Sequence, residues 1–174
     1  MKQYTVHPTR RERTFNENDI IVSKTDPKGV ITYANKTFID VSGYSEEELL
    51  GQPHNIIRHP DMPHCVFKLL WDTLERGEEI FAYVVNMSKN GDHYWVFAHV
   101  TPTFNEAHQI IGYHSSRRVP DRHQIEAVTD LYATLRSEEL RHKSWQEGMV
   151  AAGQMLSNVL TGKGVSYGEF VFSL

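Results

Sequence analysis

The hydrophobic pattern of the chain begins with two short runs of β-branched residues, at positions 20–23 ("IIVS") and 30–33 ("VITY"). Such residues favour strands. The segment "TDPKG" between them has proline early and glycine late, a composition typical of a tight turn. The pattern predicts a β-hairpin.

Helical patterns follow this hairpin. Ser45 precedes "EEELL" with Glu48 three residues later, which is the spacing of a capping box. A longer amphipathic helix is predicted over residues 62–76, with Pro63 in its first turn. Its apolar face consists of Val66, Leu69, Leu70, Thr73 and Leu74.

Three further strands are predicted at residues 80–89, 93–105 and 110–119, separated by the turns "KNGD" and "NEAHQ". Strands interrupted by a helical insert favour the α+β class, with an antiparallel sheet covered by helices on one face. Alternation along residues 93–103 places Trp95 and Phe97 on one face and Tyr94 and Val96 on the other. The sequence does not say which of the two faces the interior.

Both ends of the chain differ from this central part. Residues 1–18 are polar and lack a hydrophobic period, so we expect an N-terminal arm there, followed by the α+β domain over residues 19–119. Residues 120–174 predict a helical extension with an apolar tail, "VSYGEFVFSL". Its apolar stripes must be buried on the domain, on each other or on a second chain.

Composition excludes several classes of protein. The net charge of −4, with acidic and basic residues interspersed, argues against a dedicated nucleic-acid binder. Cys65 is the single cysteine, so no disulfide framework is expected. No apolar run approaches the roughly 20 residues that span a bilayer, and the N-terminus lacks a secretory signal. We therefore expect a cytoplasmic protein without a membrane span.

The blocks "VSGYSEEELLGQPHNIIRHPDMP" and "KNGDHYWV" resemble the flavin-binding PAS domain of bacterial aerotaxis receptors. With the flanking segments "GVITYANKTFID", "LWDTLERGE" and "IIGYHSSR", the resemblance covers about residues 20–118. It implies a PAS fold, in which a five-stranded antiparallel sheet and helices on one face enclose a cofactor cavity. It also implies FAD bound noncovalently, with the redox state of the flavin as the signal.

The sequence departs from that family at its C-terminal end. An aerotaxis receptor continues into a membrane anchor and a long signalling coiled coil, whereas this sequence ends at Leu174 with neither. The ending "KGVSYGEFVFSL" resembles that of small stand-alone PAS proteins. We therefore expect a stand-alone homodimer that signals through its C-terminal helices to a partner protein in trans.

The segment "NIIRHPDMPH" concentrates charged and imidazole side chains between two prolines. FAD carries a pyrophosphate, which favours a cationic group at the cavity mouth. The resemblance marks Arg58, His59 and Asp61 as important for retaining the cofactor. The alternative is a proline-shaped loop in which Asp61 caps the next helix and pairs with Arg58. A metal site built from the histidines here is not expected, because the prolines scatter the side chains.

Three more residues are candidate cofactor contacts. Asn86 interrupts the apolar run "FAYVVNMS", where a carboxamide is costly unless it is satisfied, and an amide can both donate to and accept from the edge of a flavin ring. Flavin-binding PAS sensors resemble this chain at that position. Trp71 can pack beside the isoalloxazine, with an ordinary core tryptophan as the alternative. Asn35 is either a pocket residue or a helix cap.

The sequence favours a sensor over an enzyme. It contains no nucleophile elbow, P-loop or dinucleotide-binding fingerprint. Photosensory PAS domains of the light-oxygen-voltage type carry their reactive cysteine in a motif whose counterpart here, "HNIIRHP", has none. Cys65 is therefore interpreted as a structural residue. Two alternatives stay open: a haem-binding gas sensor with a histidine ligand, and an apo PAS module that dimerises.

Overall fold

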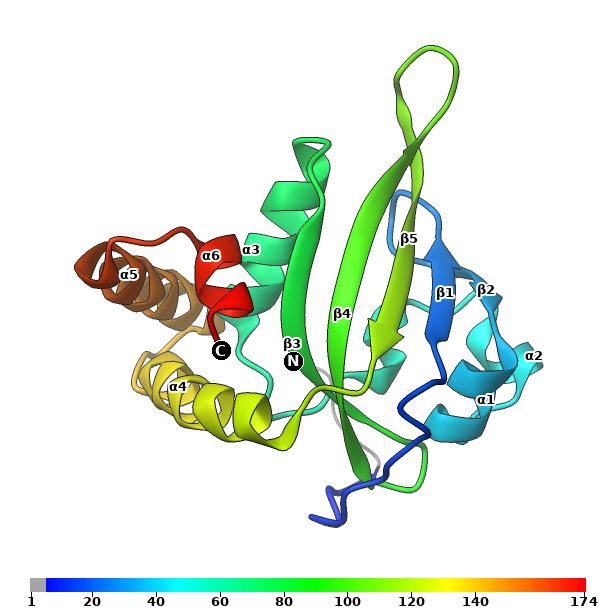
Figure 1. The fold of residues 1–174 in the computed structure, drawn as a ribbon, viewed down its shortest axis with the longest axis horizontal. Helices are drawn as coiled ribbons and strands as arrows, with labels where there is room; N and C mark the ends of the chain where they lie inside the picture. Colours follow the sequence, from blue (N-terminus) through cyan, green and yellow to red (C-terminus); the bar gives the residue numbers. More distant parts are fainter. Residues whose placement is uncertain (1–5) are drawn as a thin grey trace.

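The computed structural model describes residues 6–174, and a five-stranded antiparallel sheet forms its centre (Figure 1). The strands lie in the order β2-β1-β5-β4-β3. Their bounds are β1 Ile21–Thr25, β2 Ile31–Ala34, β3 Ile80–Met87, β4 His93–Phe104 and β5 Ile110–Arg118. The predicted α+β class, the N-terminal hairpin and the five strands are confirmed.

Short helices connect β2 to β3. They are α1 Lys36–Ser42, α2 Glu46–Leu49, the 3-10 helix η1 His54–Ile57 and α3 His64–Glu75. The capping box predicted for Ser45 and Glu48 is present at the start of α2. Helix α3 begins two residues later than predicted, because Pro63 is its N-cap in an extended conformation (φ −60°, ψ 139°) and not a member of the first turn.

Burial decides which face of β4 is the inner one. Tyr94 and Val96 are fully buried, and Ala98, two residues further along the same face, lines a cavity beneath the helices. Trp95 and Phe97 point to the opposite face and are half-buried. The inner face of the sheet is therefore the Tyr94 face.

The C-terminal segment forms three helices, α4 Arg122–Leu140, α5 Trp145–Lys163 and α6 Tyr167–Phe172, which pack against β3 and α3 (Figure 1). β3 is an edge strand, and these helices cover its edge and outer face. The Tyr132 hydroxyl donates to the backbone carbonyl of Tyr83 at 2.6 Å, and the rings of Phe81 and Phe172 are 4.8 Å apart. In residues 6–174, no helix has the length and apolar character needed to cross a membrane.

The N-terminal arm lies along the start of β4. The first five residues of the predicted arm lie outside the described residues. Pairing between β4 and β5 stops at Phe97 and Arg118, which leaves the earlier part of β4 without a neighbour on that side. The arm occupies this place: the amide of His93 donates to the Arg11 carbonyl, and the amide of Arg13 donates to the His93 carbonyl at 2.7 Å.

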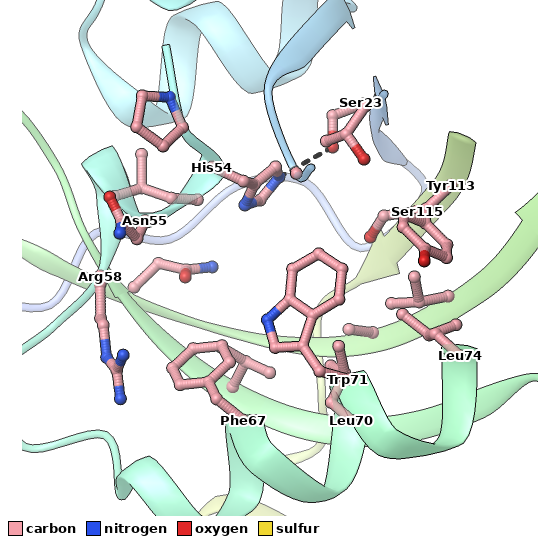
Figure 2. A pocket seen from close by; sticks show the side chains of 18 of the residues that line it. Ser23, His54, Asn55, Arg58, Phe67, Leu70, Trp71, Leu74, Tyr113 and Ser115 are labelled. Carbon is pink, nitrogen blue, oxygen red and sulfur yellow. Dashed lines mark hydrogen bonds between the residues drawn. The ribbon is translucent and has the colours of Figure 1, made fainter. Parts of the chain in front are cut away.

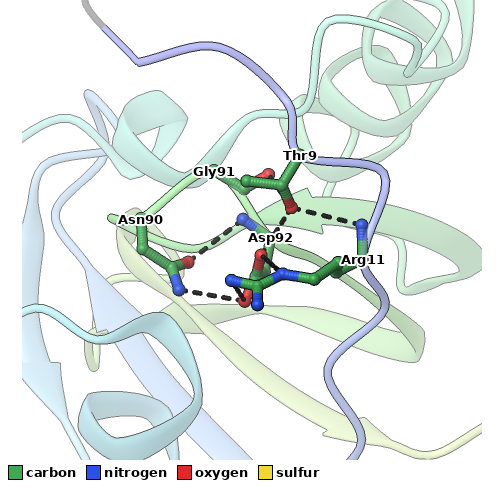
Figure 3. A network of polar contacts seen from close by, with 5 residues as sticks. All are labelled: Thr9, Arg11, Asn90, Gly91 and Asp92. Atoms are coloured by element: carbon green, nitrogen blue, oxygen red, sulfur yellow. Dashed lines mark hydrogen bonds and ion pairs between the residues drawn. The ribbon is translucent and has the colours of Figure 1, made fainter.

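A buried carboxylate, Asp92, holds the arm to the β3–β4 turn (Figure 3). It accepts hydrogen bonds from Thr9, Arg11 and Asn90. The hydrogen bond from Thr9, assisted by those from Asn90 and Arg11, holds the pKa of Asp92 below its usual range. The adjacent Gly91 has φ +92°, and a Cβ there would lie 2.3 Å from the His7 carbonyl oxygen, so the approach of the arm requires glycine.

Candidate functional site

A cavity of about 470 Å³ lies between the inner face of the sheet, η1 and α3 (Figure 2). Cavities of this size bind small molecules, and such sites combine apolar walls with a few placed polar groups. The walls here follow that pattern. Apolar side chains come mainly from the sheet, α3 and the start of α5, and polar ones come from β1, the β1–β2 turn, η1, α3, β3 and β5.

Asn86 is the polar residue that β3 contributes to the cavity. Its exposed fraction is 4%, and it shares the inner face of β3 with Val84, two residues away. A backbone bridge between Asn86 and Arg58 joins the segment after η1 to the edge of β3. This bridge brings the "NIIRHP" segment and the strand that carries Asn86 to one end of the cavity.

Trp71 projects into the cavity from α3 (Figure 2). Its ring packs edge-on against Tyr113 of β5, with centroids 5.3 Å apart. It also lies against Gly29 in the β1–β2 turn, where a Cβ would come within 3.1 Å of the indole. Glycine at position 29 thus allows the positive φ of the turn (+78°) and leaves room for the indole. A flat ring held in this way can pack against a planar ligand.

Ser23, His54 and Arg117 form a polar chain in the cavity wall. The Ser23 hydroxyl lies 3.0 Å from Nε2 of His54 and accepts a hydrogen bond from Nη2 of Arg117 at 2.6 Å. Burial, with the nearby charge of Arg117, lowers the pKa of His54 to about 3. Burial lowers the pKa of Arg117 to about 10. At neutral pH the imidazole is therefore neutral and the guanidinium is charged.

Arg117 retains hydrogen-bonding capacity that the described residues do not use. Its exposed fraction is 2%, and its Nε and Nη1 atoms find no hydrogen-bond partner within residues 6–174. The guanidinium packs 4.5 Å from the ring centroid of Phe38. Buried donors without a partner are costly, so an acceptor-bearing ligand in the cavity would stabilise this residue. The carbonyl and nitrogen acceptors at the edge of a flavin ring fit that requirement.

The charge of the cavity wall has one sign. Four basic residues, Lys28, Arg58, Lys68 and Arg117, are among the lining residues, and none of the described lining residues is Asp or Glu. One of the four, Lys68, forms an ion pair with Asp72, which lies outside the lining. Basic groups around a low-dielectric cavity attract anions. The wall therefore favours a ligand with an apolar planar part and a negatively charged part.

Of the six predicted cofactor contacts, Asn86, Trp71 and Arg58 line the cavity. The guanidinium of Arg58 lies 4.4 Å from the ring centroid of Phe67, another lining residue. Asn35 lies outside the cavity. Its Oδ1 accepts from the amides of Val22 and Phe38, and its Nδ2 donates to the Ile20 carbonyl at 2.7 Å. Asn35 is thus the N-cap of α1, which was the alternative interpretation of this residue.

His59 and Asp61 also lie outside the main cavity. Both border a second hollow, between the N-terminal arm, β4 and α4. His59 is buried, and its ring is 5.8 Å from that of His93. Nδ1 of His59 accepts from the Asp61 amide at 3.2 Å, so His59 holds the turn while the Asp61 side chain is 83% exposed.

The alternative interpretation, in which Asp61 caps α3, is also wrong, because a residue far away in the sequence binds the N-terminus of that helix. Glu139, near the end of α4, accepts from the Cys65 amide at 2.9 Å. It also contacts Nδ1 of His64 and accepts from Nη1 of Arg136, both at 3.0 Å. Burial would raise the pKa of Glu139, but the hydrogen bonds from His64 and Cys65 and the charges of His64 and Arg136 lower it. A carboxylate at a helix N-terminus is also favoured by the helix dipole.

Sequence reasoning missed Ser23, His54 and Arg117. One signal was available: Tyr113, Ser115 and Arg117 alternate along β5, and all three line the cavity. Polar residues at the alternate positions of a central strand are costly unless they serve a site. Among the described residues, no group of three or more His, Cys, Asp or Glu side chains is placed to hold a metal ion. Cys65 is buried and does not line the cavity, and burial raises its pKa to about 12.

Comparison with known proteins gives one matching family. A family model described as "PAS fold" matches residues 31–117. Over 131 residues the chain is 45% identical to the aerotaxis receptor of Escherichia coli (strain K12), covering 74% of this chain and 26% of the receptor. Over 112 residues it is 27% identical to a nitrogen fixation regulatory protein of Klebsiella pneumoniae, covering 64% of this chain and 23% of that protein. The chain thus spans about a quarter of the length of these relatives.

Solved structures show the same fold. The PAS domain of a protein from Colwellia psychrerythraea is 24% identical with a TM-score of 0.54, covering 58% of this chain and 86% of that chain. A light-oxygen-voltage domain studied with a flavin analogue is 21% identical with a TM-score of 0.56, covering 71% and 87%. At these identities the likeness concerns the fold alone.

Proposed function

This chain belongs to the PAS fold family, and from that premise we propose that it is a non-catalytic sensor. It binds FAD noncovalently in the main cavity and passes the redox state of the flavin to a partner protein. The aerotaxis receptor of E. coli, 45% identical over the shared region, supports a role in aerotaxis-like signalling.

One observation carries the choice of ligand. The cavity presents a buried amide, Asn86, and a buried guanidinium, Arg117, within otherwise apolar walls that include the indole of Trp71. Acceptors on a flavin ring match the free donors of Arg117, and the basic lining suits a pyrophosphate. When bound, the flavin supplies a redox centre whose ring nitrogen N5 gains a proton on reduction, with electrons from a reduced carrier.

We assign Asn86 as the residue whose hydrogen bonding to the flavin changes with the redox state. Its carboxamide can donate to an unprotonated nitrogen and, after rotation, accept from a protonated one. Such a rotation changes the hydrogen bonding of β3 at a buried position. The two states of the protein then differ in population rather than in chemistry.

The route from Asn86 to the C-terminal helices is short. Tyr83, three residues before Asn86 on β3, accepts from Tyr132 of α4 through its carbonyl. Its own hydroxyl donates to the Val171 carbonyl in α6 at 3.4 Å. A second route runs through α3, which carries Trp71 and whose N-terminus is bound by Glu139 of α4. Both routes support transmission of the redox signal through the helices of residues 120–174.

The first test is to identify the ligand. The purified chain is denatured by heat, and the supernatant is analysed by absorbance and mass spectrometry. We expect FAD in the supernatant. A Soret band would instead identify a haem sensor. A protein that neither retains nor takes up FAD would overturn the proposal in favour of an apo module.

The second test concerns the switch. Limited proteolysis of oxidised and dithionite-reduced protein should give different cleavage patterns in residues 120–174. Asn86→Ala should abolish that difference while FAD stays bound. The matched control is Asn158→Ala on the exposed face of α5, where the asparagine Oδ1 accepts a hydrogen bond from Gln154. A redox difference that persists in Asn86→Ala would remove Asn86 from the switch.

We further propose a cytoplasmic homodimer that signals to its partner in trans. The supporting observation is a set of exposed apolar side chains on the C-terminal helices: Leu140, Val150 and Phe172. Such groups mark interaction surfaces when they cluster. Light scattering of the purified chain measures its mass directly, and a monomer at micromolar concentration would contradict the dimer.

A further inference from the structure

Two helices border the outer end of the main cavity. His64 and Lys68 lie one turn apart on α3, and Trp145 and Met149 lie one turn apart on α5. The rings of His64 and Trp145 have centroids 6.0 Å apart. The C-terminal extension thus supplies part of the wall, beyond the family match at residues 31–117.

The position of Trp145 is fixed by packing further along α5. Gly148 lies so close to the end of α4 that a Cβ there would be 2.2 Å from the Glu139 carbonyl oxygen. Ala152 and Leu156 are buried in the core, one and two turns further on. Because these contacts hold the first turn of α5, the indole has a defined place without contributing to the core itself.

Trp145 is 54% exposed, although it lies at the edge of a cavity. More than half of the surface of this residue is therefore accessible to a second ring. Lys68 lies on the neighbouring helix α3, and Arg58, bridged to Asn86 of β3, lines the same cavity. One cavity therefore combines a buried amide and guanidinium, basic side chains and a partly exposed indole.

We propose that Trp145, with Met149 beside it, forms a subsite for the adenine of FAD. This inference rests on the proposed flavin function and adds to it. Arg58, and Lys68 on exchange of its ion pair with Asp72, supply positive charge to the pyrophosphate that joins the two ring systems of the ligand, and the adenine stacks on the indole. Two consequences follow: the protein prefers FAD to FMN and riboflavin, and the bound ligand holds α5 against the sensor domain.

The experiment measures the binding of three ligands to the full chain. Wild type, Trp145→Ala and Trp145→Phe are equilibrated with FAD, FMN or riboflavin, and the free ligand is separated by ultrafiltration. Stacking of a base on an aromatic side chain predicts that Trp145→Ala weakens FAD binding roughly 5- to 150-fold. Binding of FMN and riboflavin should be unchanged. Trp145→Phe should retain most of the affinity for FAD, and Asn158→Ala, on the exposed face of α5, should retain all of it.

The possible outcomes separate this inference from the function on which it rests. A wild-type chain that binds no flavin overturns both. A wild-type chain that binds FAD and FMN equally tightly overturns the adenine subsite alone. Equal weakening of all three ligands by Trp145→Ala would also overturn it, because the indole would then support the whole cavity. An unchanged affinity for FAD in Trp145→Ala has the same consequence.

Discussion

Glu139 connects the last helical turn of α4 to the first turn of α3, and Glu139→Ala tests that connection. The carboxylate is 3% exposed and binds the Cys65 amide, His64 and Arg136. Its removal leaves the amide without an acceptor and two basic side chains without their counter-charge. Because α3 carries Trp71, we expect both the fold and the cavity to respond.

The size of the effect follows from the exposure of each partner. Breaking a fully buried ion pair costs about 3–5 kcal/mol, but the side chains of His64 and Arg136 are 31% and 21% exposed and can regain water. Loss of a helix cap contributes about 1 kcal/mol. We therefore expect the free energy of unfolding to fall by about 2–3 kcal/mol.

Equilibrium urea unfolding followed by far-ultraviolet circular dichroism measures this change, with wild type and variant under the same ligand conditions. The control is Glu138→Ala, one residue earlier, which removes surface contacts with Arg141 and His142 and should have a smaller effect. Since the pKa of Glu139 is lowered in the folded protein, its contribution is present above its ordinary pKa and is lost as the pH falls through the lowered value. The reasoning would be refuted if Glu139→Ala matched the Glu138 control at neutral pH.

The other predictions concern the cavity wall, the edge of the sheet and the arm. Burial lowers the pKa of His54 from 6.5 to about 3, so the unfolded chain binds a proton at His54 before the folded protein does. As the pH decreases from 6.5 towards 3, the free energy of unfolding should therefore fall by about 1.4 kcal/mol per pH unit from this residue alone. His54→Gln should flatten the pH dependence, and an unaltered slope would contradict the assignment. Tyr132→Phe removes the 2.6 Å hydrogen bond to the Tyr83 carbonyl and should cost about 1 kcal/mol in urea unfolding; an unchanged midpoint would show that the bond adds nothing. Gly91→Ala should detach the arm, at a cost of about 1–3 kcal/mol, and speed tryptic cleavage after Arg10 and Arg11. The control Gly168→Ala, with nothing within 4 Å of its Cβ, should leave cleavage unchanged.

Local chemistry in the sequence specified most of the elements. The β-branched runs around "TDPKG" predicted the hairpin of β1 and β2, and Ser45 with Glu48 predicted the start of α2, because such signals depend on neighbouring residues only. Three candidate site residues line one cavity in the structure: Asn86 on β3, Trp71 on α3 and Arg58 directly after η1. Asn86 was identifiable because a carboxamide interrupts an apolar strand, and Trp71 because its indole follows the charged loop on the next helix, as in the family that the chain resembles.

Tertiary structure alone decided the contacts between distant segments. Glu139 accepts the hydrogen bond of the α3 N-terminus across 74 residues, in place of the local Asp61 cap that was the alternative interpretation. No local pattern around either residue predicts that bond. The inner face of β4 was undecided because alternation has two equivalent solutions until a helix layer covers one of them. Arg117 and Ser23 meet because β1 and β5 are neighbours in the sheet. The sequence by itself determined the PAS-like order of elements and their caps. The depth of the cavity, its single sign of charge and the reach of α5 to its mouth depend on packing between elements far apart in the chain.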